Sequence, residues 1–150
     1  MAVVATAPIQ VPTKKARKDF QRLAELRAKE AAQLAKSGHQ QGAYYLGGLA
    51  VECALKACIA KKTKRYDFPP DAKYANKVYT HELADLLKLA ELNGQLDIDV
   101  KTQPQLANNW GVVEGWSVNI RYVISKLNGK NMVAAVNSPD GVLQWIKLYW

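Results

Sequence analysis

The stretch that decides the fold runs from Gly42 to Ala60 and reads GAYYLGGLAVECALKACIA. It is apolar nearly all the way round a helix, which predicts a helix at the centre of its domain. It nevertheless carries Glu52 and Lys56, whose opposite charges are four residues apart and therefore share one face. Burying such groups is costly unless they are paired and hydrogen-bonded. The pair is therefore either a structural clamp or the floor of a polar site.

The two cysteines of the chain, Cys53 and Cys58, both lie in this stretch. Five positions on a helix place them well apart around the axis, so they cannot form a disulfide with each other. We expect two buried thiols in a reducing compartment. No apolar run approaches the length that spans a bilayer, and Pro8 and Pro12 interrupt the amino-terminal segment, which makes it a poor signal peptide. The sequence predicts a cytoplasmic protein.

The rest of the chain predicts more helices and no strands. Residues 1–13 are expected to form a flexible tail and 14–150 a single domain. Within it, 64–79 holds a Pro–Pro pair and is expected to be a loop. The expected helices are 14–36, 39–62, 80–92, 118–127 and two short ones within 132–149 divided at Ser138–Pro139, with helical spacing also in 97–115. The predicted fold class is all-α, a bundle of about five to six helices.

Capping residues in the sequence predict where several of these helices begin or end. Ser37–Gly38 ends the first, and so short a connection to the second makes the two antiparallel neighbours. Thr80 is the expected N-cap of 80–92, with Glu82 in the first turn and Asn93–Gly94 as the stop. The first helix is expected to bury a narrow apolar stripe made of Phe20, Leu23, Leu26, Ala31 and Leu34.

The charge of the chain favours anionic partners. Its 150 residues include 21 Lys and Arg against 13 Asp and Glu, a net charge of +8, which points to nucleic acid first and a membrane surface second. The alternative is a protein whose helix surfaces happen to be rich in lysine. Two basic clusters merge into one patch if the first two helices are antiparallel. These candidate nucleic-acid-binding residues are Lys14, Lys15, Arg17, Lys18, Lys61, Lys62, Lys64 and Arg65.

Four segments together resemble the HEPN-domain family. They read AYYLGGLAVECALKACIAKK in the central helix, THELADLLKLA after it, W-S-x-x-x-R-Y from Trp116 to Tyr122, and GVLQWIKLYW at the end, in the same order over roughly 17–150. The resemblance implies an up-and-down helical bundle that is usually homodimeric. Many members are ribonucleases, often toxins paired with a nucleotidyltransferase-like antitoxin, and other members are non-catalytic and bind RNA, nucleotides or partner proteins.

The ribonuclease motif of that family is absent from this sequence. Ribonuclease members carry an arginine followed, after four to six intervening residues, by a histidine, because the arginine holds a phosphate while the histidine handles protons. The only histidines here are His39 and His81, and the arginines preceding them, Arg27 and Arg65, lie much further away. Arg121 has no histidine after it. Catalysis by the familiar route is therefore not expected.

A divergent site remains open as an alternative. The candidate catalytic residues are Glu52, Lys56, His81, Arg121 and Tyr122, which would line a polar cleft. The plainer interpretation is that the charged pair is a salt bridge, that His81 packs at a helix start, that Arg121 pairs with Glu52 or Glu114, and that Tyr122 fills core. No metal-ligand spacing occurs, so no metal or cofactor is expected.

Three functions therefore follow as hypotheses. The first is a HEPN-like domain that binds RNA or a nucleotide-containing partner, in a toxin–antitoxin or defence module, without the usual ribonuclease site. The second is an active ribonuclease that uses Glu52, Lys56, His81 and Arg121. The third is a non-catalytic dimeric adaptor for another protein. The expected partners are a second copy of the chain, RNA or a nucleotide, and a nucleotidyltransferase-like antitoxin, with no membrane.

Overall fold

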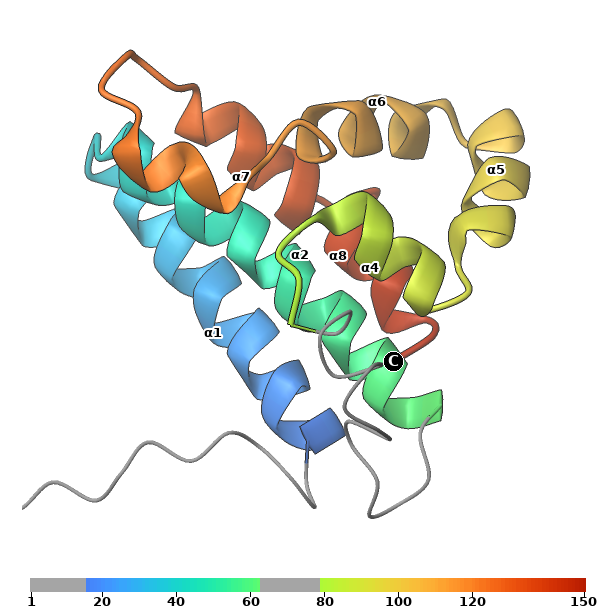
Figure 1. The fold of residues 1–150 in the computed structure, drawn as a ribbon. Coiled ribbons are helices and arrows are strands. Elements are labelled where there is room, and N and C mark those ends of the chain that lie inside the picture. Colours follow the sequence, from blue (N-terminus) through green and yellow to red (C-terminus); the bar gives the residue numbers. More distant parts are fainter. Residues whose placement is uncertain (1–15, 63–78) are drawn as a thin grey trace, which may run out of the picture.

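Helices make up the fold in this computed structural model, which describes residues 16–62 and 79–150 (Figure 1). In chain order its elements are α1 (Ala16–Lys36), α2 (Gln40–Lys62), α4 (Leu83–Leu89), α5 (Asn93–Thr102), α6 (Pro104–Val113), the 3₁₀ helix η1 (Val118–Tyr122), α7 (Gly129–Asn137) and α8 (Val142–Lys147). No strand occurs among these described residues, so the all-α prediction is confirmed. The 1–13 tail and nearly all of the predicted 64–79 loop lie outside them.

Helix α2 lies at the centre of the bundle, as its composition predicts. It contacts α1, α4, α7, α8 and η1, and its side chains Val51, Leu55 and Ile59 are fully buried. Contrary to the sequence prediction, α2 is long and apolar enough to cross a bilayer, the one such helix in the described part of the chain. Because 72% of its apolar window is buried inside the bundle, its apolarity is that of a core helix.

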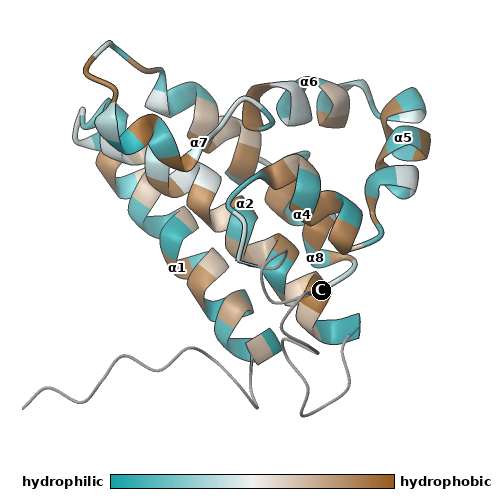
Figure 2. Cartoon of the chain, in the orientation of Figure 1, coloured by the Kyte–Doolittle hydropathy of each residue, from teal (hydrophilic) through white to brown (hydrophobic). Residues whose placement is uncertain are grey.

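Helix α1 lies antiparallel beside α2, but of the stripe predicted to be buried only Ala31 is fully buried (Figure 1). Leu26 is 48% exposed, and Phe20 and Leu23 are only partly buried. The buried residues of α1 are instead all alanines: Ala16, Ala24, Ala28, Ala31 and Ala35. Small side chains let two helix axes approach closely, which leaves the larger side chains of α1 at the margins, and Figure 2 shows hydrophilic residues on its outer side.

The end of α1 confirms the Ser37–Gly38 prediction. Gly38 has φ +82°, a left-handed conformation that suits glycine, and the N–H of His39 reaches back to the carbonyl of Leu34 at 2.9 Å. This turn reverses the chain into α2. The break predicted at Ser138–Pro139, between α7 and α8, is confirmed as well.

Helix α4 is shorter than predicted at both ends. Its N-cap is Glu82 and not Thr80, whose hydroxyl accepts a hydrogen bond from the Glu82 N–H at 3.2 Å in a turn ahead of the helix. The predicted stop at Asn93–Gly94 is wrong, because these residues open α5. Glu91 makes the turn instead, at φ +59°, and the N–H of the next residue bonds to the Leu87 carbonyl at 3.0 Å. This is the left-handed C-terminal cap that glycine usually forms, here formed by a glutamate.

The helix predicted over 118–127 is only the 3₁₀ turn η1. Beyond it, the side chain of Gln41 captures the backbone: its amide nitrogen donates to the Val123 carbonyl at 2.8 Å, and its amide oxygen accepts from the Leu127 N–H at 2.8 Å. These tertiary bonds replace the intrahelical ones that a longer helix would make. The segment therefore continues as a loop to Asn128, which caps α7 through its side chain.

Trp116 is the largest fully buried side chain and packs directly on α2. Its indole N–H donates to the Tyr45 carbonyl at 3.1 Å, and its ring stacks with the Tyr45 ring at a centroid distance of 6.1 Å. The ring occupies the space beside Gly48, where an added Cβ would lie 2.1 Å from Cδ1 of the indole. Glycine at this position is therefore what allows the tryptophan to reach the helix.

Candidate functional site

Glu52 and Lys56 form a buried charged pair in the middle of α2. The two residues are 4% and 8% exposed, and Lys56 Nζ lies 3.9 Å from Glu52 Oε1. They sit one turn apart, as the spacing predicts, on a helix that is otherwise buried by apolar neighbours. Two such charges are tolerated in this setting because each compensates the other.

His81 completes the pair from the segment that precedes α4. Its Nδ1 lies 2.5 Å from Glu52 Oε1, while about half of its side chain is exposed to solvent. The turn around Thr80 and the start of α4 hold the imidazole over the middle of α2. Three of the five predicted catalytic candidates, Glu52, Lys56 and His81, therefore lie together. We call them the Glu52 cluster.

This arrangement has a defined chemical capability. A carboxylate that accepts the Nδ1–H of a histidine fixes the ring orientation and leaves Nε2 to exchange a proton with a second group. Glu52 occupies that orienting position, and the exposed half of His81 is open to solvent. The adjacent ammonium of Lys56 balances the carboxylate charge. The cluster can thus act as a salt-bridged clamp or as an oriented general base.

The two cysteine thiols near the Glu52 cluster are also buried, which makes them poor nucleophiles. Burial raises the pKa of the Cys53 thiol to about 12, to which the Glu52 carboxylate adds while Lys56 and Arg27 oppose it. Burial likewise raises the pKa of Cys58 to about 11, against the opposing charges of nearby basic residues. Both cysteines are buried and free, as the sequence predicts.

We expect the native thiols to resist alkylation. At pH 8 these pKa values leave a thiolate fraction of roughly 10⁻³ or less, so labelling by iodoacetamide should be at least about 100-fold slower than in the unfolded chain. Mass spectrometry of the time course measures the difference, with urea-unfolded protein as the control. Rapid labelling of either cysteine in the native protein would contradict the buried placement.

Arg121 and Tyr122 do not join the Glu52 cluster. The Arg121 Nε–H donates within its own turn to the Val118 carbonyl at 3.1 Å, and its guanidinium lies 5.3 Å from the centre of the Tyr122 ring. The loop that follows is bound to Gln41, at the beginning of α2 and three turns before Glu52. The expectation that Tyr122 fills core is also wrong, because it is 76% exposed.

Basic residues gather where α1 begins and α2 ends. Helices α1 and α2 are antiparallel, so Arg17 at the start of α1 lies at the same end of the bundle as Lys61 and Lys62 at the end of α2 (Figure 1). The burial that raises the pKa of the Cys58 thiol is opposed by the charges of all three. Arg17 also donates to the Trp150 carbonyl at 2.7 Å, and Lys62 pairs with Glu91 at 2.8 Å. Lys18 lies in the same first turn of α1 as Arg17, so the described members of the two predicted clusters are at one end of the bundle; we call this surface the basic end. The remaining members, Lys14, Lys15, Lys64 and Arg65, lie outside the described residues.

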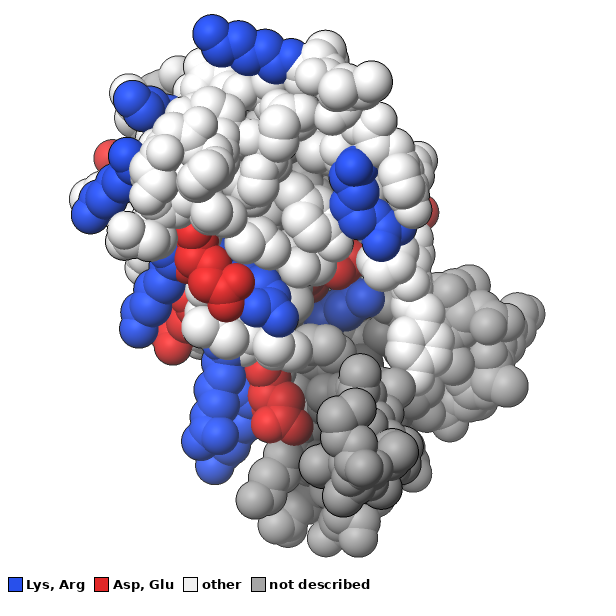
Figure 3. All heavy atoms as spheres, turned by 90° about the vertical axis from the view of Figure 1, so that its left-hand side faces the viewer, with Lys and Arg blue, Asp and Glu red and all other residues white. Residues whose placement is uncertain are grey.

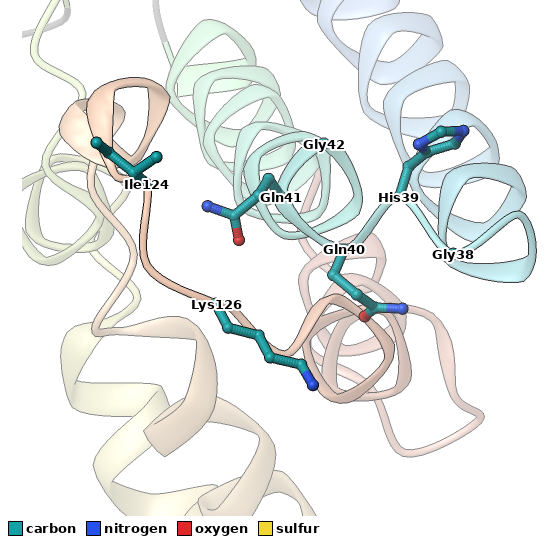
Figure 4. A pocket seen from close by; sticks show the side chains of 7 residues that line it. All are labelled: Gly38, His39, Gln40, Gln41, Gly42, Ile124 and Lys126. Carbon is teal, nitrogen blue, oxygen red and sulfur yellow. The ribbon is translucent and has the colours of Figure 1, made fainter.

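An open pocket of about 500 Å³ lies at the opposite end of α2, where sequence patterns gave no signal. Figure 4 shows Gln41 pointing toward the loop that carries Ile124 and Lys126, with the His39 ring turned away from Lys126. Gln40 adds a bond from the Lys130 N–H to its side-chain oxygen at 2.9 Å. Both glutamines look like ordinary surface residues in the sequence, because their partners are more than 80 positions away.

No metal centre emerges within 16–62 and 79–150, where no group of three or more His, Cys, Asp or Glu side chains could hold an ion. Comparisons with protein-family models, with curated proteins and with solved structures give no match to this chain. The Glu52 cluster and the surface charges are the features of the molecule that bear on its function.

Proposed function

We propose that this protein is a HEPN-like helical domain that binds RNA through its basic end. The observation that carries the proposal is the antiparallel packing of α1 and α2, which puts Arg17 at the same end of the bundle as Lys61 and Lys62 and supports the merging of the two basic clusters. Clustered Lys and Arg side chains bind the phosphate backbone by releasing counterions, without reading the sequence. The net charge of +8 favours the same class of partner.

The family resemblance extends this proposal to partners. It implies a homodimer and a nucleotidyltransferase-like antitoxin, within a toxin–antitoxin or defence module in the cytoplasm. Sedimentation equilibrium of the pure protein tests the dimer, and a monomer at micromolar concentration would remove that part of the proposal. RNA binding by the basic end does not depend on it.

We expect the affinity for single-stranded RNA to fall steeply with salt. Changing Lys61→Gln and Lys62→Gln together removes two phosphate contacts, so the slope of log affinity against log salt should decrease by roughly 1.4. Fluorescence anisotropy with a labelled oligonucleotide measures it. The matched control, Lys29→Gln with Lys101→Gln, removes the same charge from exposed positions on α1 and α5 and should leave the slope unchanged. If both pairs of substitutions lower the slope equally, RNA binding is not localised at the basic end.

A second function, RNA cleavage, is favoured by the contact between His81 and Glu52. A carboxylate-oriented histidine with a half-exposed ring suits proton transfer at a 2′-hydroxyl or a leaving oxygen. The basic end lies along α2 from this pair, about 15 Å away by helix rise, so an RNA strand bound there could reach His81.

If the cluster is catalytic, RNA should be cleaved without added metal and His81→Asn should lower the rate by about 10²–10⁴-fold. Gel electrophoresis of a labelled RNA measures the rate, and His39→Asn is the control because its ring lies at the other end of α2. Glu52→Gln should lower the rate as well. If His81→Asn cleaves RNA as fast as the native protein does, the Glu52 cluster is not catalytic. If the native protein does not cleave RNA, the proposal of RNA binding alone stands.

A further inference from the structure

The end of the bundle opposite the basic end lacks acidic residues in the segments that build it. Residues 31–51 cover the end of α1, its turn and the first half of α2, and 115–139 cover η1, its loop and α7. Neither range contains Asp or Glu, and the basic residues in them are Lys36, His39, Arg121, Lys126 and Lys130. The bonds from Gln40 and Gln41 to the loop join the two segments. Figure 3 shows a largely uncharged area in its upper half, with Lys and Arg side chains above and beside it and acidic side chains mainly along its lower border.

The loop at this end also presents apolar side chains to solvent. Ile124 is 98% exposed and Tyr122 is 76% exposed, the two highest values among the exposed large apolar residues of the described chain. The loop is held on both sides of Ile124, because Gln41 bonds to the residue before it and to Leu127 after it. The tip is therefore a fixed projection in which an aliphatic side chain stands clear of the surface. We call it the Ile124 loop.

We propose that the Ile124 loop docks the protein on an anionic lipid surface, with Ile124 inserted among the acyl chains and Arg121, Lys126 and Lys130 among the headgroups. An aliphatic tip flanked by cations along the chain combines the two attractions that hold proteins at such interfaces, and tyrosine suits the headgroup level. This peripheral contact needs no membrane-spanning segment and replaces the expectation that the protein has no membrane partner.

The chemistry of the loop favours lipid over RNA as its occupant. Single-stranded RNA is held by bases stacked on open aromatic faces. Ile124 has no such face, and the Tyr122 ring already carries the Arg121 guanidinium at 5.3 Å. A fully exposed aliphatic side chain gains nothing from a phosphate backbone, but it gains from leaving water for hydrocarbon.

Co-sedimentation with vesicles tests the proposal. We expect the full-length protein to bind vesicles of 70% phosphatidylcholine and 30% phosphatidylglycerol, and to bind pure phosphatidylcholine at least tenfold more weakly. Ile124→Ser should weaken binding on the order of tenfold. Lys126→Gln with Lys130→Gln should weaken it about 25-fold. The control is Leu148→Ser, which removes a 72% exposed leucine next to α8 and should have no effect.

Three results would overturn the inference: no binding to anionic vesicles, equal binding to both vesicle types, or equal losses in Ile124→Ser and Leu148→Ser. A loss of RNA affinity in Ile124→Ser without any vesicle binding would assign the loop to RNA instead. Because the basic end is unaltered in these variants, failure here leaves the RNA-binding proposal standing, and the Lys61 and Lys62 variants test that one separately. Circular dichroism of Ile124→Ser, whose side chain makes no core contact, confirms that the fold is intact.

Discussion

Replacing Gly48 with alanine is expected to lower the free energy of unfolding by about 2–4 kcal/mol. The new Cβ would lie 2.1 Å from the Trp116 ring, which is buried and cannot move aside without losing its bond to the Tyr45 carbonyl. In an open helix the same change would raise stability by about 1 kcal/mol, since alanine is the better helix former. The clash therefore determines that the substitution lowers the free energy of unfolding here and does not raise it. Urea denaturation followed by circular dichroism measures it.

A glycine in α6 supplies the matched control. Gly111 lies inside that helix with nothing within 4 Å of an added Cβ, so Gly111→Ala should stabilise the protein by about 0.5–1 kcal/mol. The double variant Gly48→Ala, Trp116→Leu should lose less free energy of unfolding than the two single variants lose together, because it has no indole for the new methyl group to clash with. A Gly48→Ala protein as stable as the original would show that Trp116 does not pack as described.

Removing the charge of Glu52 is the second large effect. Glu52→Gln keeps the shape of the side chain but leaves the Lys56 ammonium buried without its anion, which we expect to cost about 3 kcal/mol. His81→Asn should cost less than about 1.5 kcal/mol, since half of that side chain is already in water. Urea denaturation of both variants at pH 7 gives the comparison.

A double substitution then distinguishes whether the Glu52 cluster is a structural clamp or a functional site. Glu52→Leu with Lys56→Met removes both charges at similar volume, and it should recover stability to within about 1 kcal/mol of the original protein. If the recovered variant also binds or cleaves RNA as the original does, the Glu52 cluster is a clamp. If stability returns while activity is lost, the cluster belongs to the site. A Glu52→Gln variant with unchanged stability would contradict the buried ion pair.

The parts of the fold that the sequence predicts are those encoded over one or two turns of chain. The unbroken apolar character of 42–60 places α2 at the centre, and Gly38 ends α1 because glycine suits a left-handed turn. Glu52 and Lys56 meet because four positions span one helical turn. These signals need no knowledge of the rest of the molecule.

The parts that escape prediction depend on distant neighbours. Alanine stripes carry little hydrophobic signal, so the buried face of α1 becomes visible only when α2 is seen against it. Glu91 turns the chain where Asn93–Gly94 is the obvious candidate. A left-handed φ is unfavourable for a residue with a Cβ, so the residue type gives no signal of this turn. Arg121 is assigned to the wrong end of α2 because sequence spacing says nothing of how a 3₁₀ turn docks.

The charged pair in α2 has one more consequence, which concerns biosynthesis. A 23-residue helix of this apolarity resembles a membrane span to any machinery that reads the chain before it folds. Glu52 and Lys56 fall near its midpoint, where each charge raises the free energy of insertion by about 2.5–3.5 kcal/mol. The same two residues that are tolerated in the bundle through mutual compensation therefore disfavour the lipid core for the nascent segment, which biases α2 toward its place inside the folded domain.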